Sequence, residues 1–379
     1  MKVGVLTFHR STNFGTMLQA HATVEAIEAA GAEAEIIDYR PEYIERTFRK
    51  KREIKTPKQL LSVIYNKVIF GNAPNRKLDH FMEYIGNLKI ASHPCFSIDD
   101  LVRSVQDYDV ILSGSDQLWN KNITGYDMAY FFPFEHTRKI SLSSSFGTRT
   151  ISAERSSEIA PYLREFRCIS VREKTAKNIL DQMKDDSWQA DINITLDPTL
   201  FLSKEEWSKY QTKVKSLPLD GYILTYYMIE TPLLRQITEV IKKQTGLPTV
   251  NIKPSKRQMI FHEGINLPDL GPGEFLSCYA GARYVVTNSF HGTAFAVNYG
   301  IPVYVSPLPV SMAGEVNSRL VDLLETFVIL DRWIDTPDKL LSINTNESMD
   351  VSTVLNENRE ASKTILRDMI CGEDAYDGK

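Results

Sequence analysis

The segment from Val285 to Val305 combines residue types that suit anion binding and proton transfer. A β-branched strand leads into the polar turn NSFHG, residues 288–292, and a small, apolar helical run follows from Thr293 to Tyr299. Ligands of parallel α/β sheets lie outside the carboxyl ends of the strands, and helix N-termini attract anions. We therefore expect Ser289 and His291 to face an anion-binding crevice, where an imidazole can transfer protons. The alternative is a capped turn whose histidine is satisfied by the backbone.

Two earlier turns carry hydrogen-bonding side chains at the same kind of position. The apolar strand Lys2 to Thr7 precedes the turn HRSTNFG and a helix near Thr16, and the strand Tyr108 to Ser113 precedes GSDQLWN. Small residues let a ligand approach the backbone, and carboxylate and amide groups suit sugar hydroxyls. The candidate acceptor-binding residues in these turns are His9, Asn13, Ser115, Asp116, Gln117 and Asn120.

Two arginines are candidates for holding an anionic substrate. Arg172 follows the strand Cys168 to Val171, and Arg319 lies in the first turn of a predicted helix that begins at Asn317. A guanidinium at a strand exit points toward the same crevice as the turns. For Arg172, an ion pair with a neighbouring carboxylate such as Glu173 is the alternative.

Composition excludes several classes of protein. In 379 residues, 42% are hydrophobic and 24% charged, which is typical of a globular protein, and the net charge of −4 gives no reason to expect a nucleic-acid partner. The four cysteines form no CxxC pair and no metal-like cluster, so we expect a reduced, cytoplasmic protein with no metal site. The opening MKVGVLTFHR reads as a core strand, and no apolar run is long enough to span a membrane.

Residues 46–77 differ from the rest of the chain because they are strongly basic. They include the helical, apolar-rich stretch LLSVIYNKVIF, and basic flanks around an amphipathic helix suit an anionic membrane surface or a lipid phosphate. The alternative is a solvated excursion that packs its apolar side on its own domain. The basic residues, opposed by Glu53 alone, are Arg46, Arg49, Lys50, Lys51, Arg52, Lys55, Lys58, Lys67, Arg76 and Lys77.

The order of predicted elements indicates two α/β domains. Strands alternate with helices up to Pro198, and a second series starts after Gly221. We expect an N-terminal Rossmann-like domain over residues 1–210 with the basic insertion 46–77. A C-terminal Rossmann-like domain should follow over 211–345, and a further helix lies in 346–379. The predicted architecture is α/β, with two parallel sheets that face a central cleft.

Six motifs, in this order, resemble the polysaccharide pyruvyl transferase family over nearly the whole chain. They are TFHRSTNFGTMLQA, ILSGSDQLWN, SVREKTA, LDPTLFLSKEEW, TNSFHGTAFAVNYGIP and NSRLVDLL. The resemblance implies a GT-B-like fold, with an acceptor-side N-terminal domain, a donor-side C-terminal domain and a helix in 346–379 that packs back on the first domain. It also implies transfer of the enolpyruvyl unit of phosphoenolpyruvate onto two hydroxyls of a sugar, giving a cyclic pyruvate ketal. Such activity serves capsule, exopolysaccharide or other cell-surface glycan synthesis. Phosphoenolpyruvate is then a co-substrate, and no cofactor is implied.

The resemblance also implies roles for particular residues. Arg172 matches an arginine that binds the donor, and His291 matches a histidine that acts near the reacting carbon. Some members carry an arginine two residues before that histidine, where this chain has Ser289. Either Arg319 or Lys253 then supplies the missing positive charge, or the donor binds in a different position. The remaining donor-binding candidates are Asn288, Ser289 and Gly292, next to the helix N-terminus.

The chemistry requires a proton on C3 of the donor and removal of a proton from the attacking hydroxyl. A histidine suits the acid, Asp116 can act as the base, and His9, Asn13 and Gln117 would hold the sugar. The resemblance implies a hexose-containing glycan acceptor, often a lipid-linked precursor such as one carried on a polyprenyl phosphate. Contact with the inner face of the membrane through 46–77 would suit a lipid-linked acceptor.

Two other functions are compatible with this architecture. A nucleotide-sugar glycosyltransferase or epimerase commonly holds the ribose with a glutamate in the helix after this turn, but residues 293–305 contain no acidic residue. A non-catalytic glycan-binding protein would not need arginines from both domains, and its ligand should bind without phosphoenolpyruvate.

Overall fold

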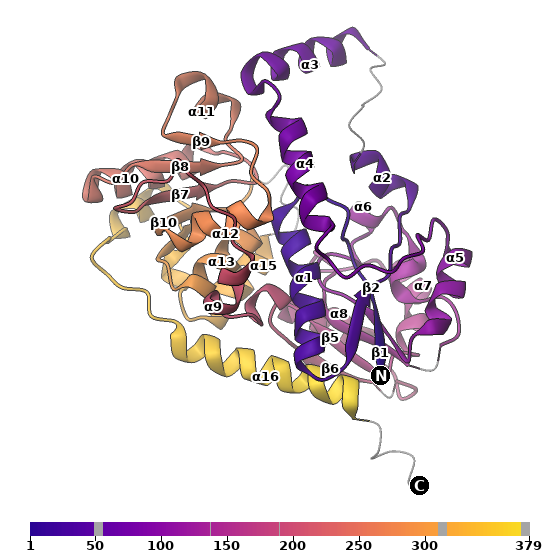
Figure 1. Ribbon diagram of the computed structural model, residues 1–379. Helices are drawn as coiled ribbons and strands as arrows, with labels where there is room; N and C mark the ends of the chain where they lie inside the picture. The colour runs from indigo at the N-terminus through magenta and orange to yellow at the C-terminus, as the bar shows by residue number, and fades with distance from the viewer. Residues whose placement is uncertain (49–55, 137, 189, 310–316, 373–379) are drawn as a thin grey trace. The chain divides into compact units, whose positions relative to one another are not determined.

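The computed structural model describes residues 1–48, 56–136, 138–188, 190–309 and 317–372 (Figure 1). The chain forms two compact units, each assembled from separate stretches of sequence. The first unit comprises Met1–Thr47, Leu88–Leu202 and Val354–Lys379, and the second comprises Phe48–Asn87 and Ser203–Thr353.

The first unit is built on a six-stranded parallel sheet with the strand order β2-β1-β3-β4-β5-β6. Its central strands are buried on both faces, which agrees with the continuous apolar runs in the sequence. Because every strand is parallel, the carboxyl ends of the strands meet at one edge. The strands are β1 (Lys2–Leu6), β2 (Glu33–Ile36), β3 (Val110–Ser113), β4 (Lys139–Ser144), β5 (Cys168–Val171) and β6 (Asp191–Ile194).

Helices cover this sheet, and the last helix of the chain belongs to the same unit. Helix α16 (Ser352–Cys371) contacts it at distant points, because Ser362 Oγ accepts a hydrogen bond from the Leu196 amide at 3.0 Å and Arg138 donates to the Met369 carbonyl at 3.0 Å. The other helices are α1 (Phe14–Ala29), α2 (Glu42–Phe48), α5 (Ile98–Ser104), α6 (Lys121–Thr124), α7 (Ala153–Leu163) and α8 (Lys174–Met183).

The second unit has a five-stranded parallel sheet with the order β11-β10-β7-β8-β9. Two parallel sheets are therefore present, which confirms the predicted α/β class. Strand β10 lies between β11 and β7, so the turn that follows it stands at the carboxyl edge between the exits of these two strands. The strands are β7 (Tyr222–Tyr226), β8 (Thr249–Ile252), β9 (Ile265–Leu267), β10 (Ala282–Thr287) and β11 (Val303–Val305).

Residues 48–87 group with the second unit, whereas the sequence placed the basic insertion in the first domain. The reason is specific contacts of α4 (Ala73–Ile85): Arg76 pairs with Asp269 at 2.6 Å, and His80 with Glu274 at 3.3 Å. Helix α3 (Pro57–Phe70) lies at the far end of α4, beside α11 (Figure 1). The remaining helices are α9 (Lys204–Trp207), α10 (Pro232–Thr245), α11 (Lys256–Phe261), α12 (Pro272–Ala280), α13 (Phe290–Tyr299) and α15 (Asn317–Thr326).

Candidate active site

The turn after β10 is tightly fixed by its own polar groups. Helix α13 begins at Phe290, so His291 and Gly292 lie within its first turn, and the helix start predicted at Thr293 was three residues late. The Ser289 hydroxyl accepts a hydrogen bond from the Gly292 amide at 3.2 Å. Gly292 is needed for packing, since an added Cβ would lie 2.5 Å from the Thr287 hydroxyl.

Asn288 holds the loop that follows β7. Its side-chain oxygen accepts a hydrogen bond from the Met228 amide at 2.8 Å, and its amide nitrogen donates to the Ile229 carbonyl at 2.8 Å. The side chain is completely buried. Asn288 therefore ties two neighbouring strand exits together, which positions the turn that carries His291.

His291 and Arg319 are brought together by one aromatic ring. The His291 ring packs edge-on against Phe290 with a centroid distance of 5.3 Å, and the Arg319 guanidinium lies 5.8 Å from the centre of the same ring. His291 is 7% exposed and Arg319 is 6% exposed. Cation–π attraction is strongest where water is excluded, so Phe290 helps to hold a positive charge beside the imidazole.

A second pair of cations lies in the same unit. Lys253 directly follows β8, and burial lowers its pKa. Burial, and then the positive charge of Lys253, lower the pKa of Lys77 in α4 to about 7. Two neighbouring ammonium groups repel each other, so an anion bound between them would relieve that cost.

Lys77 was not among the candidate binding residues predicted from the sequence. It was counted with the basic segment assigned to the membrane, although the buried positions Leu78 and Phe81 mark an apolar face of α4 next to it. The Lys77 ammonium lies 5.4 Å from the centre of the Phe81 ring. The spacing of those apolar residues was the available signal.

We expect Lys77→Met to stabilise the protein, most strongly below about pH 7. The ordinary lysine pKa of 10.5 applies to the unfolded chain, so between about 7 and 10.5 the unfolded state binds more protons and the free energy of unfolding rises with pH. Lys77→Met has no buried ammonium group, so its gain in free energy of unfolding over the wild type should shrink toward pH 10.5. Urea unfolding of both proteins across this pH range measures that gain. Lys67→Met on the exposed α3 is the control, and equal gains in both variants would contradict the assignment.

In the first unit, Arg172 is surrounded by carboxylates. Its guanidinium pairs with Asp197 at 2.7 Å and lies 3.6 Å from Glu173 and 3.9 Å from Asp116, with a side chain only 1% exposed. Burial alone would lower the pKa of Arg172, but the three carboxylates raise it. The alternative considered for Arg172, an ion pair, describes these contacts, with Asp197 as a closer partner than Glu173.

We expect Arg172→Ala to lower the free energy of unfolding by about 3–5 kcal/mol, because the substitution leaves buried carboxylates without their cation. Chemical denaturation measures the loss. The double variant Arg172→Ala with Asp197→Asn lacks one of the uncompensated negative charges. It should therefore recover part of the lost free energy of unfolding. A stable Arg172→Ala protein that binds the donor weakly would instead favour the donor-binding role.

Asp116 stands at the exit of β3 with a left-handed backbone, φ 78°. Its carboxylate accepts hydrogen bonds from the Thr16 hydroxyl at 2.8 Å and from the Gln117 amide at 2.9 Å. The Ser115 hydroxyl donates to Asp197 at 3.1 Å. Ser115 and Asp116 therefore join the polar cluster around Arg172.

Gln117 and Asn120 form a pair above Gly147. The Asn120 side-chain amide donates to the Gln117 oxygen at 2.8 Å, and an added Cβ at Gly147 would lie 2.0 Å from that oxygen. Asn120 also caps α6 by accepting from the Asn122 amide at 3.0 Å. Gln117 is half-buried and more open to a ligand than Asn120, which is buried.

His9 and Asn13 make structural contacts. Asn13 caps α1 by accepting from the Gly15 amide at 3.0 Å. The two ring nitrogens of His9 lie 3.1 Å from the Thr7 carbonyl and 3.0 Å from Asp38, and His9 is 1% exposed. Burial would raise the pKa of the Asp38 carboxyl, but the hydrogen bonds from His9 and Arg40 lower it to about 2.

The predicted residues thus form two groups, one in each unit. The donor-side candidates Asn288, Ser289, His291, Gly292, Arg319 and Lys253 belong to the second unit, and the acceptor-side candidates His9, Asn13, Ser115, Asp116, Gln117 and Asn120 belong to the first, as does Arg172. The acceptor-side group contains a carboxylate cluster around Arg172. The donor-side group contains the His291 imidazole with Arg319 beside it, and the Lys253 and Lys77 pair belongs to the same unit. An anionic substrate is therefore better matched by the second unit.

Solved structures share the fold at low sequence identity. UDP-GlcNAc 2-epimerase from Methanocaldococcus jannaschii has a TM-score of 0.58 and 11% identity, with 98% of this chain and 99% of that chain covered. The enzyme from Neisseria meningitidis bound to UDP-GlcNAc has a TM-score of 0.50 and 11% identity, with 98% and 100% covered. These likenesses show a GT-B-like fold, as predicted, and nothing further.

The family comparison is more specific. No curated protein matches the sequence significantly. A family model described as polysaccharide pyruvyl transferase matches residues 13–306, a range that includes the turns after β3, β5 and β10. Four of the six motifs that suggested this family lie within that range, TFHRSTNFGTMLQA overlaps its start, and NSRLVDLL lies beyond its end. The chain therefore belongs to the polysaccharide pyruvyl transferase family and is a transferase.

Proposed function

We propose that the protein transfers the enolpyruvyl unit of phosphoenolpyruvate to two hydroxyls of a glycan sugar, forming a cyclic pyruvate ketal and releasing phosphate. The observation that carries this proposal is the cluster of His291, Phe290 and Arg319 at the carboxyl edge of the second sheet. Phosphoenolpyruvate carries a carboxylate and a phosphate, so it requires cations and hydrogen-bond donors in a small volume. Arg319, Lys253 and Lys77 supply the cations.

The proposed reaction starts with a proton from His291 to C3 of the donor. C2 becomes cationic and is attacked by one sugar hydroxyl, whose proton passes to a base, for which Asp116 is the candidate. Phosphate then leaves C2, and the second hydroxyl closes the ring and loses its own proton. Each general acid or base contributes about 10²–10⁴-fold.

The test is release of phosphate from phosphoenolpyruvate by the purified protein with a panel of lipid-linked and free glycosides. The product should carry a new ketal methyl group, visible by NMR, in the same amount as the phosphate released. A protein that leaves phosphoenolpyruvate intact but consumes UDP-sugars would be a nucleotide-sugar enzyme, and one that binds glycans without turnover would be a glycan-binding protein.

We further propose that α3 places the protein on an anionic membrane surface, at the cytoplasmic face where phosphoenolpyruvate is available. No residue of α3 is buried, although Leu60, Leu61, Ile64 and Val68 lie on one side of it, and Leu61 and Val68 are 68% and 78% exposed. No described helix is long and apolar enough to cross a bilayer, so contact would be at the surface. Such a helix lies in the membrane interface, and its neighbours Lys58 and Lys67 would face lipid phosphates.

We expect Leu61→Asp with Val68→Asp to abolish binding to vesicles that contain anionic lipid. The substitutions place two charges on the face that would enter the interface. Sedimentation with vesicles at low salt measures binding. Leu341→Asp is a matched control, since Leu341 is 92% exposed elsewhere in the same unit. A wild-type protein that ignores anionic vesicles would rule out this contact. Lys50, Lys51 and Arg52, assigned to the same surface from the sequence, lie outside the described residues.

A further inference from the structure

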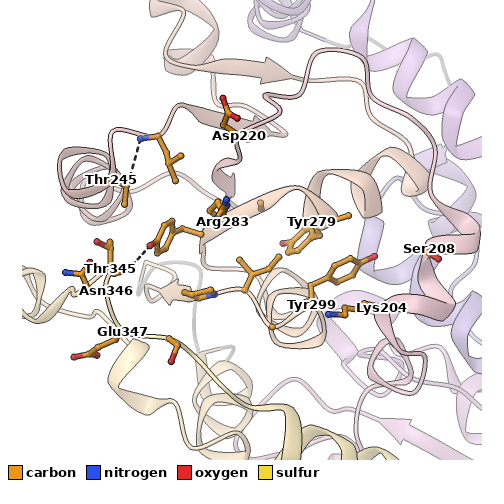
Figure 2. Close-up of a pocket in the computed structure, with 18 of the residues that line it drawn as sticks. Lys204, Ser208, Asp220, Thr245, Tyr279, Arg283, Tyr299, Thr345, Asn346 and Glu347 are labelled. Carbon is orange, nitrogen blue, oxygen red and sulfur yellow. Dashed lines mark hydrogen bonds between the residues drawn. The ribbon is translucent and has the colours of Figure 1, made fainter.

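A cavity of about 950 Å³ opens at the amino edge of the second sheet, the edge opposite to the His291 turn. Its walls include residues next to the starts of strands β7, β10 and β11, among them Asp220, Ala282 and Pro302. Small-molecule sites usually occupy about 300–1,000 Å³, so this cavity has room for more than one sugar ring. We call it the amino-edge pocket (Figure 2).

Three helices end at the amino-edge pocket. Thr245 ends α10, Ala280 ends α12 and Tyr299 ends α13, and all three residues line the cavity. The carbonyl groups at helix C-termini carry partial negative charge, which disfavours phosphate and carboxylate ligands. Lining side chains add no excess of positive charge, because Lys204 and Arg283 are balanced by Glu205, Asp220 and Glu347. The electrostatics therefore disfavour an anionic ligand.

Aromatic rings form part of the wall. The half-buried Tyr299 ring lies 6.3 Å from the ring of Tyr279, at 52°, and both are visible on the same side of the pocket in Figure 2. Tyr279 is fully buried and supports Tyr299 from behind. The Tyr284 hydroxyl donates to the Thr345 carbonyl at 2.7 Å, which fixes a third ring. Burial raises the pKa of Tyr299 to about 12, so its hydroxyl stays neutral. Fixed, neutral aromatic rings suit the apolar faces of sugar rings.

Hydrogen-bonding groups surround these rings. The Arg283 side chain is exposed, and no described residue forms a hydrogen bond or ion pair with it. It lies across Gly221, where an added Cβ would be 2.4 Å from the Arg283 Cγ atom. Asn346 and Ser348 also line the pocket. These guanidinium, amide and hydroxyl groups suit the hydroxyls of a polyol.

We propose that the amino-edge pocket binds an uncharged stretch of the glycan acceptor, away from the sugar that reacts. The inference rests on the proposed function for the identity of that acceptor. Binding at a second point raises the effective concentration of a polymeric acceptor without new contacts at the reacting sugar. The KM for a polymeric acceptor should therefore be lower than the KM for a monomeric glycoside with the same terminal sugar.

The test is electrophoresis of the folded protein through native gels that contain dextran, laminarin or galactomannan, all uncharged. At least one of them should retard the wild type, and anionic alginate should not. Arg283→Ala with Asn346→Ala removes two exposed hydrogen-bonding side chains and should weaken retardation about fivefold or more. Ala280→Trp fills the cavity from an exposed position and should abolish retardation. Arg257→Ala, outside the pocket in the same unit, is the control, and thermal melts verify folding.

The inference is overturned if none of the three polysaccharides retards the wild type, or if Ala280→Trp is retarded as strongly as the wild type. The gels contain no phosphoenolpyruvate, so this result is independent of the proposed reaction. If the gels show retardation but no acceptor gives phosphate release, the proposed function is contradicted and the glycan-binding pocket is supported. If phosphate is released but no polysaccharide retards the protein, only the proposal for the pocket is contradicted. Ala280→Trp should release phosphate normally with a monomeric glycoside.

Discussion

His291→Gln is expected to lower kcat by about 100-fold or more while the affinity for phosphoenolpyruvate is largely kept. Glutamine preserves much of the size and hydrogen bonding of the imidazole, but it does not donate a proton in the same way. The buried position of His291 against Phe290, close to Arg319, favours a role at the reacting atoms over a solvent-exposed role. Steady-state phosphate release, with both kcat and KM for the donor, measures the effect.

The control is His262→Gln, which changes an exposed histidine of the same unit. Its kcat should match the wild type. If His291→Gln turns over normally and only binds phosphoenolpyruvate more weakly, then His291 holds the donor and the acid lies elsewhere. His9 was the next candidate from the sequence, but its two nitrogens face the Thr7 carbonyl and Asp38 inside the first unit. These contacts make His9 a weaker candidate than His291 for the proton donor.

Arg319→Ala is expected to raise the concentration of phosphoenolpyruvate needed for half-maximal rate by about 30-fold or more. Loss of one partner from a buried, charge-assisted contact costs roughly 2–5 kcal/mol. The donor at neutral pH carries up to three negative charges, and Arg319 is the cation beside His291. Titration of donor binding by calorimetry, together with KM, measures the change. Arg319→Lys keeps the positive charge but lacks the guanidinium fork. Its donor affinity should therefore lie between those of the wild type and Arg319→Ala.

A matched control exists in the same unit. Arg332 is 6% exposed and lies 5.3 Å from the centre of the Tyr304 ring, so it repeats the environment of Arg319 at another place. Arg332→Ala should lower stability without changing donor affinity. If Arg319→Ala leaves donor affinity unchanged and Lys253→Ala abolishes it, the second cation has been misassigned to Arg319, and the pair of Lys253 and Lys77 holds the donor.

The central strands could be predicted because each is a continuous apolar run in the sequence. Strands β5 and β8 have the bounds expected from the sequence, since buried parallel strands are continuous apolar runs. Strands β6 and β9 were missed, because their residues, DINI and INL, include polar side chains and are only partly buried. Edge position alone was not the reason, since the edge strand β11 has the expected bounds and carries the buried run VYV.

The candidate site was predictable in position and less so in environment. Strand exits place His291, Arg172 and Asp116 at carboxyl edges by topology alone. The partners of Arg172 are less local, since Asp197 lies 25 residues away and only the folded sheet brings the two within 2.7 Å. Lys77 was missed for the same reason, because its neighbour Lys253 follows β8, far along the chain. Burial and charge neighbours are properties of the assembled unit.

The grouping of residues 48–87 and of α16 has a consequence for how the protein is made. Because the chain passes from the first unit to the second and back twice, neither unit corresponds to one continuous stretch. A ribosome releases β1 to β6 long before it releases Ser362 and Met369, whose contacts with Leu196 and Arg138 complete the first unit. The first unit to begin synthesis is therefore the last to be finished, and fragments cut at residue 203 would leave each half without an element that the other half encodes.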